Sequence, residues 1–298
     1  MALFRLIRLL PAVLFAAGAA AAAPLPVSQV PESKPRSTPL LDDHSGPNGY
    51  SDPFLWTCLG DLARGRIGEG EQACSTAIQF DPKDGDAYEL RGYAYLIEHR
   101  FERAEADFQA ALKLRPDNPE DLAGYGQSLS GLGRFNEAVI QFDKAVAQEP
   151  NDAAYRNALC WAVAGTGKNL DRALDECNRA IALAPGKAAP LNSRGLVELR
   201  MGRYQPAIAD YTQSVAANVY QPSAYFGRGL ARLATGQKEA GATDIRTARN
   251  GDADIDGMFV MLGVLNRECA AGVTAKCPAG FPKRTEEGKW MVAKWLVQ

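Results

Sequence analysis

The sequence predicts an all-α fold in which antiparallel helix pairs stack into an α-solenoid, and two periodic series of residues support this prediction. Prolines recur at Pro82, Pro116, Pro150 and Pro185, with separations of 34, 34 and 35 residues. A second series has separations of 34, 34, 34, 35 and 34 residues and consists of Cys58, Gly92, Gly126, Cys160, Gly195 and Gly229. Two series in phase over about 200 residues indicate a structural repeat and not one central core.

The composition excludes several classes of function. The 298 residues carry 33 Lys and Arg against 35 Asp and Glu, a formal net charge of −2, whereas a nucleic-acid-binding domain is normally basic. Only two His are present, and His is the commonest metal ligand and a frequent general base. Zinc-ligand spacing, paired catalytic carboxylates and a nucleophile elbow are not recognisable. We therefore expect a protein that is not an enzyme, binds no nucleic acid and needs no cofactor or metal.

Residues 1–23 have the layout of a secretory signal peptide. Arg5 and Arg8 precede an apolar stretch that passes into an Ala-rich run ending at Ala23. A basic region, an apolar region and small residues in this order are typical of export signals, so we expect a periplasmic or secreted protein. The alternative is an uncleaved membrane anchor, because about 20 residues can span a bilayer. Pro11 and the weak hydrophobicity of alanine argue against that alternative.

Residues 24–50 are predicted to be a disordered linker. This segment holds six prolines and several serines but few paired apolar positions. Such a composition buries too little surface to offset the entropy of ordering the chain.

Residues 51–253 carry the repeat itself. Small and aromatic residues recur before the prolines, first as Ala104, Phe108, Ala111 and Pro116 and then as Ala138, Phe142, Ala145 and Pro150. This pattern resembles that of the tetratricopeptide repeat (TPR) family, with about six repeats in this chain. The resemblance implies a right-handed superhelix with a C-terminal cap. The fit is best in repeats two to four, since end repeats face solvent or a cap instead of another repeat.

Function in TPR proteins, as the resemblance implies, lies in a concave groove lined by the first helix of each repeat. Placing this sequence on the pattern predicts a groove formed by Glu89, Tyr93, Gln127, Asn157, Trp161 and Asn192. This lining is acidic at one end and rich in amides at the other. It departs from the TPR subclass that clamps acidic chaperone tails, because Lys and Arg are absent from the clamp positions.

Two interpretations of the amide-rich end remain open. In the first, Asn157 and Asn192 hold an extended peptide backbone and Trp161 supplies an aromatic anchor. In the second, the two amides are ordinary helix-surface residues and Trp161 packs between repeats, because a single aromatic residue at helical spacing is often part of a core.

Four of the six cysteines are in register with the repeat. Cys58 and Cys160 take the glycine position of the first helix, while Cys74 and Cys177 take the phenylalanine position of the second helix. In an antiparallel hairpin these two positions lie opposite each other, at nearly the same level along the helix axes. We therefore expect disulfides Cys58–Cys74 and Cys160–Cys177, with Cys269–Cys277 formed by elimination. The alternative is that buried Cys replaces a small apolar residue, but an oxidising destination favours disulfides.

The turns between paired helices contain two features that could suggest chemistry. Residues 162–169 faintly resemble a phosphate-binding loop, but no strand precedes them and Asn169 replaces the Ser or Thr that would bind magnesium. We interpret this segment as a turn lengthened by one residue. His99 falls in the equivalent turn of repeat two and is expected to be exposed.

Residues 254–298 are predicted to form a cap. Residues 255–265 are expected to be helical, the Cys269–Cys277 loop follows, and Trp290 and Trp295 belong to an apolar cluster near the end of the chain. We expect this segment to shield the last repeat. The alternative is a docking surface for a partner or a membrane; membrane contact is otherwise expected only through an uncleaved N-terminus.

Taken together, these features predict an exported protein-interaction scaffold or adaptor of the cell envelope that binds a peptide or partner protein. The alternative is an accessory or specificity subunit of a separate cell-envelope enzyme complex. A repeat array specifies a surface and leaves the identity of the ligand open.

Overall fold

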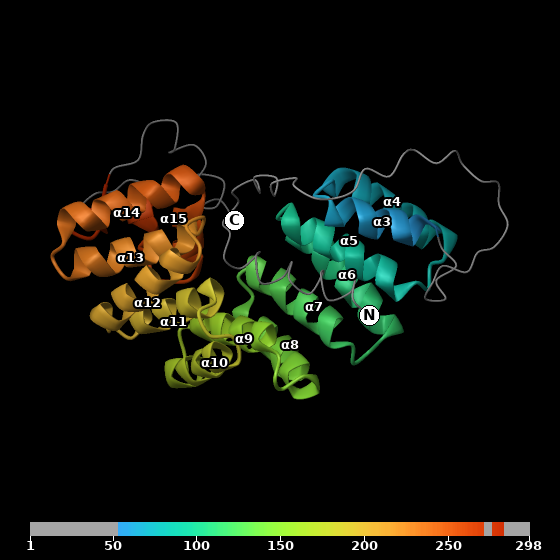
Figure 1. Ribbon diagram of the computed structural model, residues 1–298, viewed down its shortest axis with the longest axis horizontal. Coiled ribbons are helices and arrows are strands. Elements are labelled where there is room, and N and C mark those ends of the chain that lie inside the picture. Colours follow the sequence, from blue (N-terminus) through green and yellow to red (C-terminus); the bar gives the residue numbers. More distant parts are fainter. Residues whose placement is uncertain (1–52, 271–275, 283–298) are drawn as a thin grey trace. The chain divides into compact units, whose positions relative to one another are not determined.

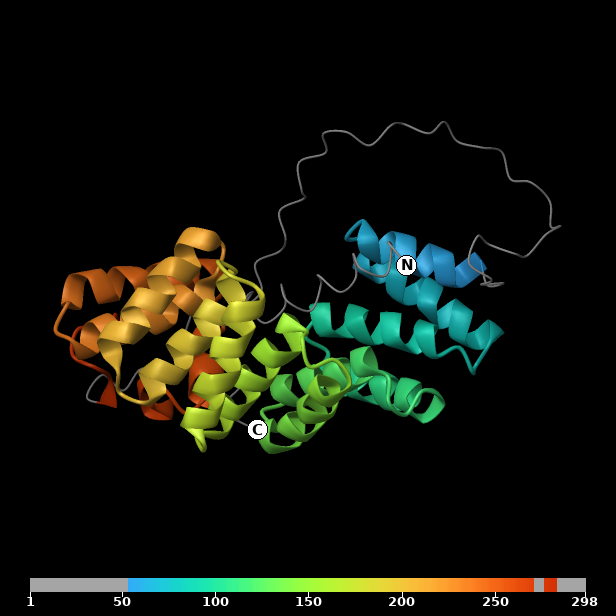
Figure 2. The same ribbon diagram turned by 60° about the horizontal axis from the view of Figure 1, so that its bottom comes forward.

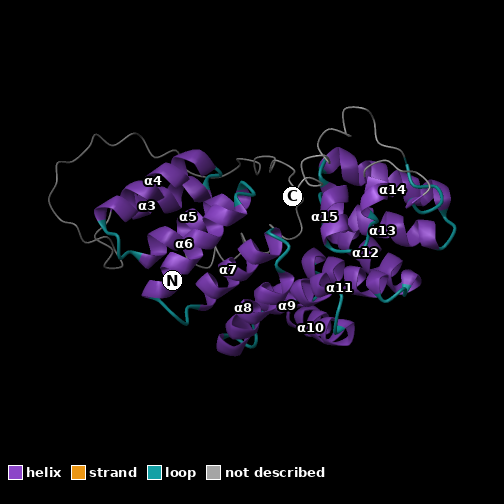
Figure 3. Cartoon of the chain, turned by 180° about the vertical axis from the view of Figure 1, so that it is seen from behind, coloured by secondary structure: helices purple, strands orange, loops and turns teal. Residues whose placement is uncertain are grey.

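The computed structural model describes residues 53–270 and 276–282. The predicted signal peptide, the linker and the cluster around Trp290 and Trp295 lie outside these residues. Within the described ranges every regular element is a helix and no strand occurs (Figure 3). The prediction of an all-α solenoid is therefore confirmed.

The described helices belong to two compact parts, residues 53–116 and residues 117–282. The N-terminal part consists of α3 (Pro53–Ala63), α4 (Ile67–Phe80), α5 (Gly85–Ile97) and α6 (Phe101–Leu114). The C-terminal part consists of α7 (Pro119–Gly131), α8 (Phe135–Gln148), α9 (Ala153–Thr166), α10 (Leu170–Leu183), α11 (Ala188–Arg200), α12 (Tyr204–Ala217), α13 (Pro222–Ala234), α14 (Lys238–Gly251), α15 (Ile255–Met261) and α16 (Arg267–Ala270). Figure 1 labels most of these helices and colours them along the chain.

Successive helices pair as the repeat predicts. The pairs α3–α4 and α5–α6 are in contact, as are α7–α8, α9–α10, α11–α12 and α13–α14. Within the C-terminal part, the second helix of each repeat also contacts the first helix of the next, and α4 contacts α5 in the same way in the N-terminal part (Figure 2). Each apolar stripe is thus buried by a neighbour, as a solenoid requires.

Local sequence signals set the ends of these helices. The helices α4, α6, α8 and α10 each end two residues before one of the periodic prolines, because proline lacks an N–H and disfavours helix in the residue before it. The next helix in repeats two to four begins after a side-chain cap. Asp84, Asn118 and Asp152 each accept a hydrogen bond from a backbone N–H of the first turn, at 2.8–3.1 Å. These caps also recur every 34 residues.

The two helices of a repeat come closest at what we call the core pair, formed by the small residue of the first helix and its partner on the second helix. In repeat three this pair is Gly126 and Phe142. A Cβ atom added to Gly126 would lie 2.9 Å from the Phe142 ring, and that ring is fully buried. Gly92 and Gly195 meet Phe108 and Tyr211 at the same 2.9 Å. A larger residue at these glycines would have to displace a packed ring, which core packing does not readily allow.

Cysteines form the core pair in repeats one and four. The Cα–Cα distance is 5.0 Å for Cys58 and Cys74 and 5.3 Å for Cys160 and Cys177. Cys269 and Cys277 are 4.8 Å apart by the same measure. These separations are typical of disulfides. The six cysteines therefore come together in the three pairs that the sequence predicts.

The cap packs on repeat six and also extends beyond it. Phe259 of α15 contacts Phe226 of α13, with ring centroids 4.6 Å apart. At the end of α15, Met261 lies against the turn of repeat three, where a Cβ atom added to Gly133 would be 3.3 Å from its Cγ atom. The helix α15 is shorter than the helix expected over residues 255–265. One contact of the cap therefore joins residues that are far apart in the sequence.

The turn inside each hairpin requires a left-handed backbone. The backbone φ angle lies between 73° and 82° at the turn glycines Gly65, Gly133, Gly202 and Gly236. His99 occupies the same turn position in repeat two with φ 57°, and it is exposed as expected. The segment 162–169 is the end of α9 followed by a turn in which Gly167 and Asn169 both have positive φ, so it is a turn and not a phosphate loop. A side chain at positive φ costs roughly 1–2 kcal/mol, a cost that glycine avoids.

We predict that His99→Gly stabilises the protein by roughly 1 kcal/mol, because it removes a side chain from a left-handed backbone position. The free energy of unfolding would be measured by chemical denaturation. The matched control is Gly202→Ala, at the same turn position of repeat five and with no atom near the added Cβ, which should lose a similar amount. Unchanged stability in both variants would contradict the strain argument.

Candidate partner-binding surface

The predicted groove residues lie on the first helices of their repeats and in both compact parts. Glu89 and Tyr93 are on α5 in the N-terminal part, and Gln127, Asn157, Trp161 and Asn192 are on α7, α9 and α11 in the C-terminal part. All six side chains are buried, with exposed fractions between 2% and 8%. The structure thus brings together the members of the second group, on helices that contact one another.

The acidic end of the predicted groove is neutralised within the chain. Arg115, which follows α6, forms ion pairs with Asp86 and with Glu89, the latter at 2.9 Å. Its Nη2 atom also donates to the carbonyl oxygen of Gly85 at 3.1 Å. Tyr93 packs edge-on against Phe108 with ring centroids 5.1 Å apart. These contacts give Glu89 and Tyr93 internal roles that the sequence did not indicate.

Asn192 and Trp161 also have internal contacts. The Nδ2 atom of Asn192 donates to the Ser223 hydroxyl at 3.2 Å, which links α11 to α13. Trp161 is buried on α9, in keeping with the interpretation that it packs between repeats. Whether either residue also touches a partner stays a prediction.

Gln127 and Asn157 differ from the other polar members of the set. Each residue is only 5% exposed. The side-chain oxygen of each is inaccessible to solvent and accepts no hydrogen bond from the described part of the chain. Asn157 occupies the same position in repeat four as Asn192 does in repeat five. Asn192 bonds Ser223 of repeat six, but the residue of repeat five that corresponds to Ser223 is Ala189, which has no hydroxyl to offer Asn157. A buried amide oxygen without a donor costs free energy that a bonding partner would recover.

A set of arginine clamps was not anticipated from the sequence. In repeats two, five and six, an arginine directly before the core glycine forms a bidentate ion pair with an aspartate 16 residues later, on the second helix. The pairs are Arg91–Asp107, Arg194–Asp210 and Arg228–Asp244, with N–O distances of 2.7–2.8 Å. The hydrogen bonds that Arg91 donates to Asp107 raise the pKa of Arg91, against the opposing effect of burial. Their recurrence in the printed sequence is the signal that could have revealed them.

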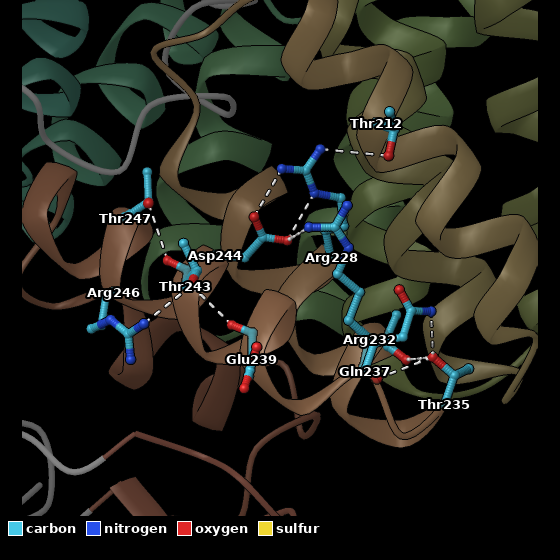
Figure 4. Close-up of polar contacts among 11 residues, drawn as sticks. Thr212, Arg228, Arg232, Thr235, Gln237, Glu239, Thr243, Asp244, Arg246 and Thr247 are labelled. Carbon is cyan, nitrogen blue, oxygen red and sulfur yellow. Dashed lines mark hydrogen bonds and ion pairs between the residues drawn. The ribbon is translucent and has the colours of Figure 1, made fainter.

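Each clamp also reaches the preceding repeat. The Nη1 atom of Arg91 donates to the Ser75 hydroxyl at 3.1 Å, and that of Arg194 donates to Asn178 Oδ1 at 2.9 Å. In repeat six, Arg228 reaches the Thr212 hydroxyl at 3.5 Å while Arg232 adds a second cation to Asp244 at 2.7 Å (Figure 4). One guanidinium thus connects three helices, which fixes how neighbouring repeats stack.

Neither a metal site nor a membrane span is found in the part of the chain that the structure describes. No group of three or more His, Cys, Asp or Glu residues there is arranged to hold a metal ion. No helix among residues 53–270 and 276–282 is long and apolar enough to cross a bilayer.

Comparison with known protein families agrees with the repeat pattern. One tetratricopeptide repeat model matches residues 95–160, and a second matches residues 60–119 and 192–255. Together they cover more than half of the chain. The chain belongs to the tetratricopeptide repeat family.

Relatives of this TPR protein share the repeat region. Human tetratricopeptide repeat protein 6 is 30% identical over 173 residues, which is 55% of this chain and 32% of that protein. The chain spans a third or less of the length of such curated relatives. Among solved structures, the Cut9–Hcn1 hetero-tetramer of the APC/C matches with a TM-score of 0.60 at 17% identity, over 70% of this chain and 42% of the matched chain. PilW, a type IV pilus biogenesis factor, matches with a TM-score of 0.57 at 20% identity, over 66% and 91% respectively. These structures share the fold.

We predict that Asp244→Ala destabilises the protein by about 3 kcal/mol, because it leaves Arg228 buried and unpaired. The free energy of unfolding in denaturant is the measurement. The matched control is Asp143→Ala on α8, whose pair with Arg172 is exposed on both sides and should contribute at most about 0.5 kcal/mol. Equal losses in the two variants would show that burial of the clamp does not matter.

Proposed function

We propose that this TPR protein is a non-enzymatic scaffold of the cell envelope that binds an extended peptide segment of a partner protein across α7 and α9. The TPR fold generally serves protein–protein interaction, and the finer assignment rests on the unused hydrogen-bonding capacity of Gln127 and Asn157. Their buried oxygens have no donor among residues 53–270 and 276–282. A peptide backbone presents N–H donors at regular intervals and carbonyl acceptors between them, which is what side-chain amides bond.

The choice of these two amides follows from their surroundings. Asn192, at the same repeat position as Asn157, already bonds Ser223, and Glu89 is already paired with Arg115. Gln127 and Asn157 are on neighbouring first helices that contact each other. An extended peptide crossing α7 and α9 would satisfy both oxygens after the two amide side chains turn toward it. Each bond to a group that is otherwise unsatisfied is worth roughly 1–3 kcal/mol.

The cell-envelope location is supported by two features of the sequence and the fold. Residues 1–23 have the layout of an export signal, and the six cysteines lie in three pairs at disulfide distance. Disulfides persist in oxidising compartments and are rare in the cytosol. Cys58–Cys74 and Cys160–Cys177 each close a short loop inside one hairpin, and such a bridge stabilises by about 3 kcal/mol in the chain-entropy model.

We predict that replacing both amides, as Gln127→Leu with Asn157→Leu, weakens peptide binding by tenfold or more. Peptides would be selected by the wild-type chain from a random dodecapeptide library, and their affinities for each variant measured by fluorescence anisotropy. The variant should remain as stable as the wild type, because leucine of similar volume replaces an unsatisfied amide. Gln213→Leu, at an exposed position of α12, is the matched control and should bind normally.

A selected peptide that binds the double variant as tightly as the wild type would refute the proposed binding site. Photo-crosslinking from position 127 in the native envelope would then identify the natural partner. An envelope enzyme recovered in this way would favour the role of an accessory subunit.

We further predict that the exported protein, denatured without reductant, has no reactive thiol. Titration with a chromogenic thiol reagent should detect six thiols only after reduction. Six reactive thiols before reduction would contradict both the disulfides and the oxidising location.

A further inference from the structure

Arg200, the last residue of α11, is a half-buried cation that has no partner among the described residues. Among the described residues no side chain or carbonyl group bonds its guanidinium, and its Nη1 atom is both inaccessible to solvent and unsatisfied. Burial lowers its pKa. An arginine nevertheless stays protonated in proteins, so a full positive charge is held here with no carboxylate from residues 53–270 or 276–282 to compensate it.

The other arginines show how unusual this is within the described chain. Every other described arginine that is buried or half-buried bonds a carboxylate, and these residues are Arg91, Arg100, Arg115, Arg156, Arg194, Arg228, Arg232 and Arg249. A partly desolvated guanidinium recovers the lost hydration by pairing with a carboxylate, often through two parallel hydrogen bonds. A carboxylate that pairs with Arg200 would come from outside the described residues.

Two glycines in turns lie beside the Arg200 fork. A Cβ atom added to Gly167, in the turn after α9, would lie 2.5 Å from Nη2. A Cβ atom added to Gly263, just after α15, would lie 3.6 Å from Nη2 and 3.7 Å from Nη1. Neither residue has a side chain that could bond or cover the fork. The cation therefore lies where the turn of repeat four meets the beginning of the cap.

Arg200 also belongs to the helix that continues the proposed binding surface. It lies two helical turns beyond Asn192 on α11, and residues eight apart lie on the same side of a helix. Its side chain reaches back to the turn that follows α9, the helix that carries Asn157. A peptide that crosses α7 and α9 could therefore extend toward this cation.

We propose that Arg200 turns its guanidinium toward the binding surface and binds a carboxylate of the partner peptide, either its C-terminal carboxylate or an Asp or Glu side chain. This inference rests on the proposed function. It gives the binding surface a polarity, with amides that hold the backbone over α7 and α9 and a single cation near the end of α11 that selects an acidic group.

The test uses the peptides selected by the wild-type chain from the random dodecapeptide library. Arg200→Gln should weaken their binding by tenfold or more. The matched control is Arg203→Gln, which changes an exposed arginine three residues further on and should bind normally. The selected peptide would then be synthesised with an amidated C-terminus, and separately with Asp and Glu replaced by Asn and Gln, to distinguish the two sources of the carboxylate. The form that lacks the recognised carboxylate should bind wild type and Arg200→Gln equally weakly.

The outcomes separate the two proposals. If the double amide variant loses binding while Arg200→Gln retains it, the binding surface stands and the role of Arg200 is refuted. Peptides that bind equally well without any carboxylate refute it as well. Selection of no peptide at all by the wild type would refute both proposals. Arg200→Gln should melt at the same temperature as the wild type or higher, because it removes an unpaired charge; a lower melting temperature would point to an internal role and count against the proposal.

Discussion

The rest of the structure depends on the close approach of two antiparallel helices at one position of each repeat. A glycine on the first helix leaves room for a ring on the second, as with Gly126 and Phe142. The same geometry brings two cysteines to disulfide distance in repeats one and four. Because every hairpin is built around this contact, the position of the contact along the two helix axes fixes which residues of the two helices face each other. The stacking of repeats and the position of each groove residue follow from that register.

The chain uses two different means of fixing this contact, and they do not occur in the same repeat. Repeats one and four have a cysteine pair and lack the arginine clamp. Repeats two, five and six have the clamp next to a glycine and a large apolar residue. In repeat four Glu176 takes the place of the clamp aspartate. It pairs with Arg156, which lies about one helical turn before the position of the clamp arginine on α9. A disulfide between the paired cysteines would hold one hairpin only, whereas the clamp arginines also bond the preceding repeat.

The repeat could be read from the sequence because its signals are local or strictly periodic. Prolines mark where second helices end, and the register of the cysteines correctly predicts which of them meet. The clamps recur in only three repeats, as Arg194 and Arg228 with Asp210 and Asp244 show, and isolated charges on helices are usually solvated, so their spacing did not predict ion pairs. Other features could not be foreseen. The pairing of Glu89 with Arg115, and the lack of a partner for Arg200 among the described residues, depend on which side chains of different helices come within a few ångströms. No spacing within one helix encodes that.

The contact between Met261 and the turn at Gly133 changes the mechanical character of the C-terminal part. In an open solenoid each repeat touches only its neighbours, so repeats deform one by one and the ends fray independently. A contact between the cap and repeat three joins the two ends of the C-terminal part, so separating any of the repeats between them must first break that contact. It also raises the average sequence separation of contacts, which slows folding relative to a purely local array. The C-terminal part should therefore act as one cooperative body that holds its curvature under load, instead of flexing like a free superhelix.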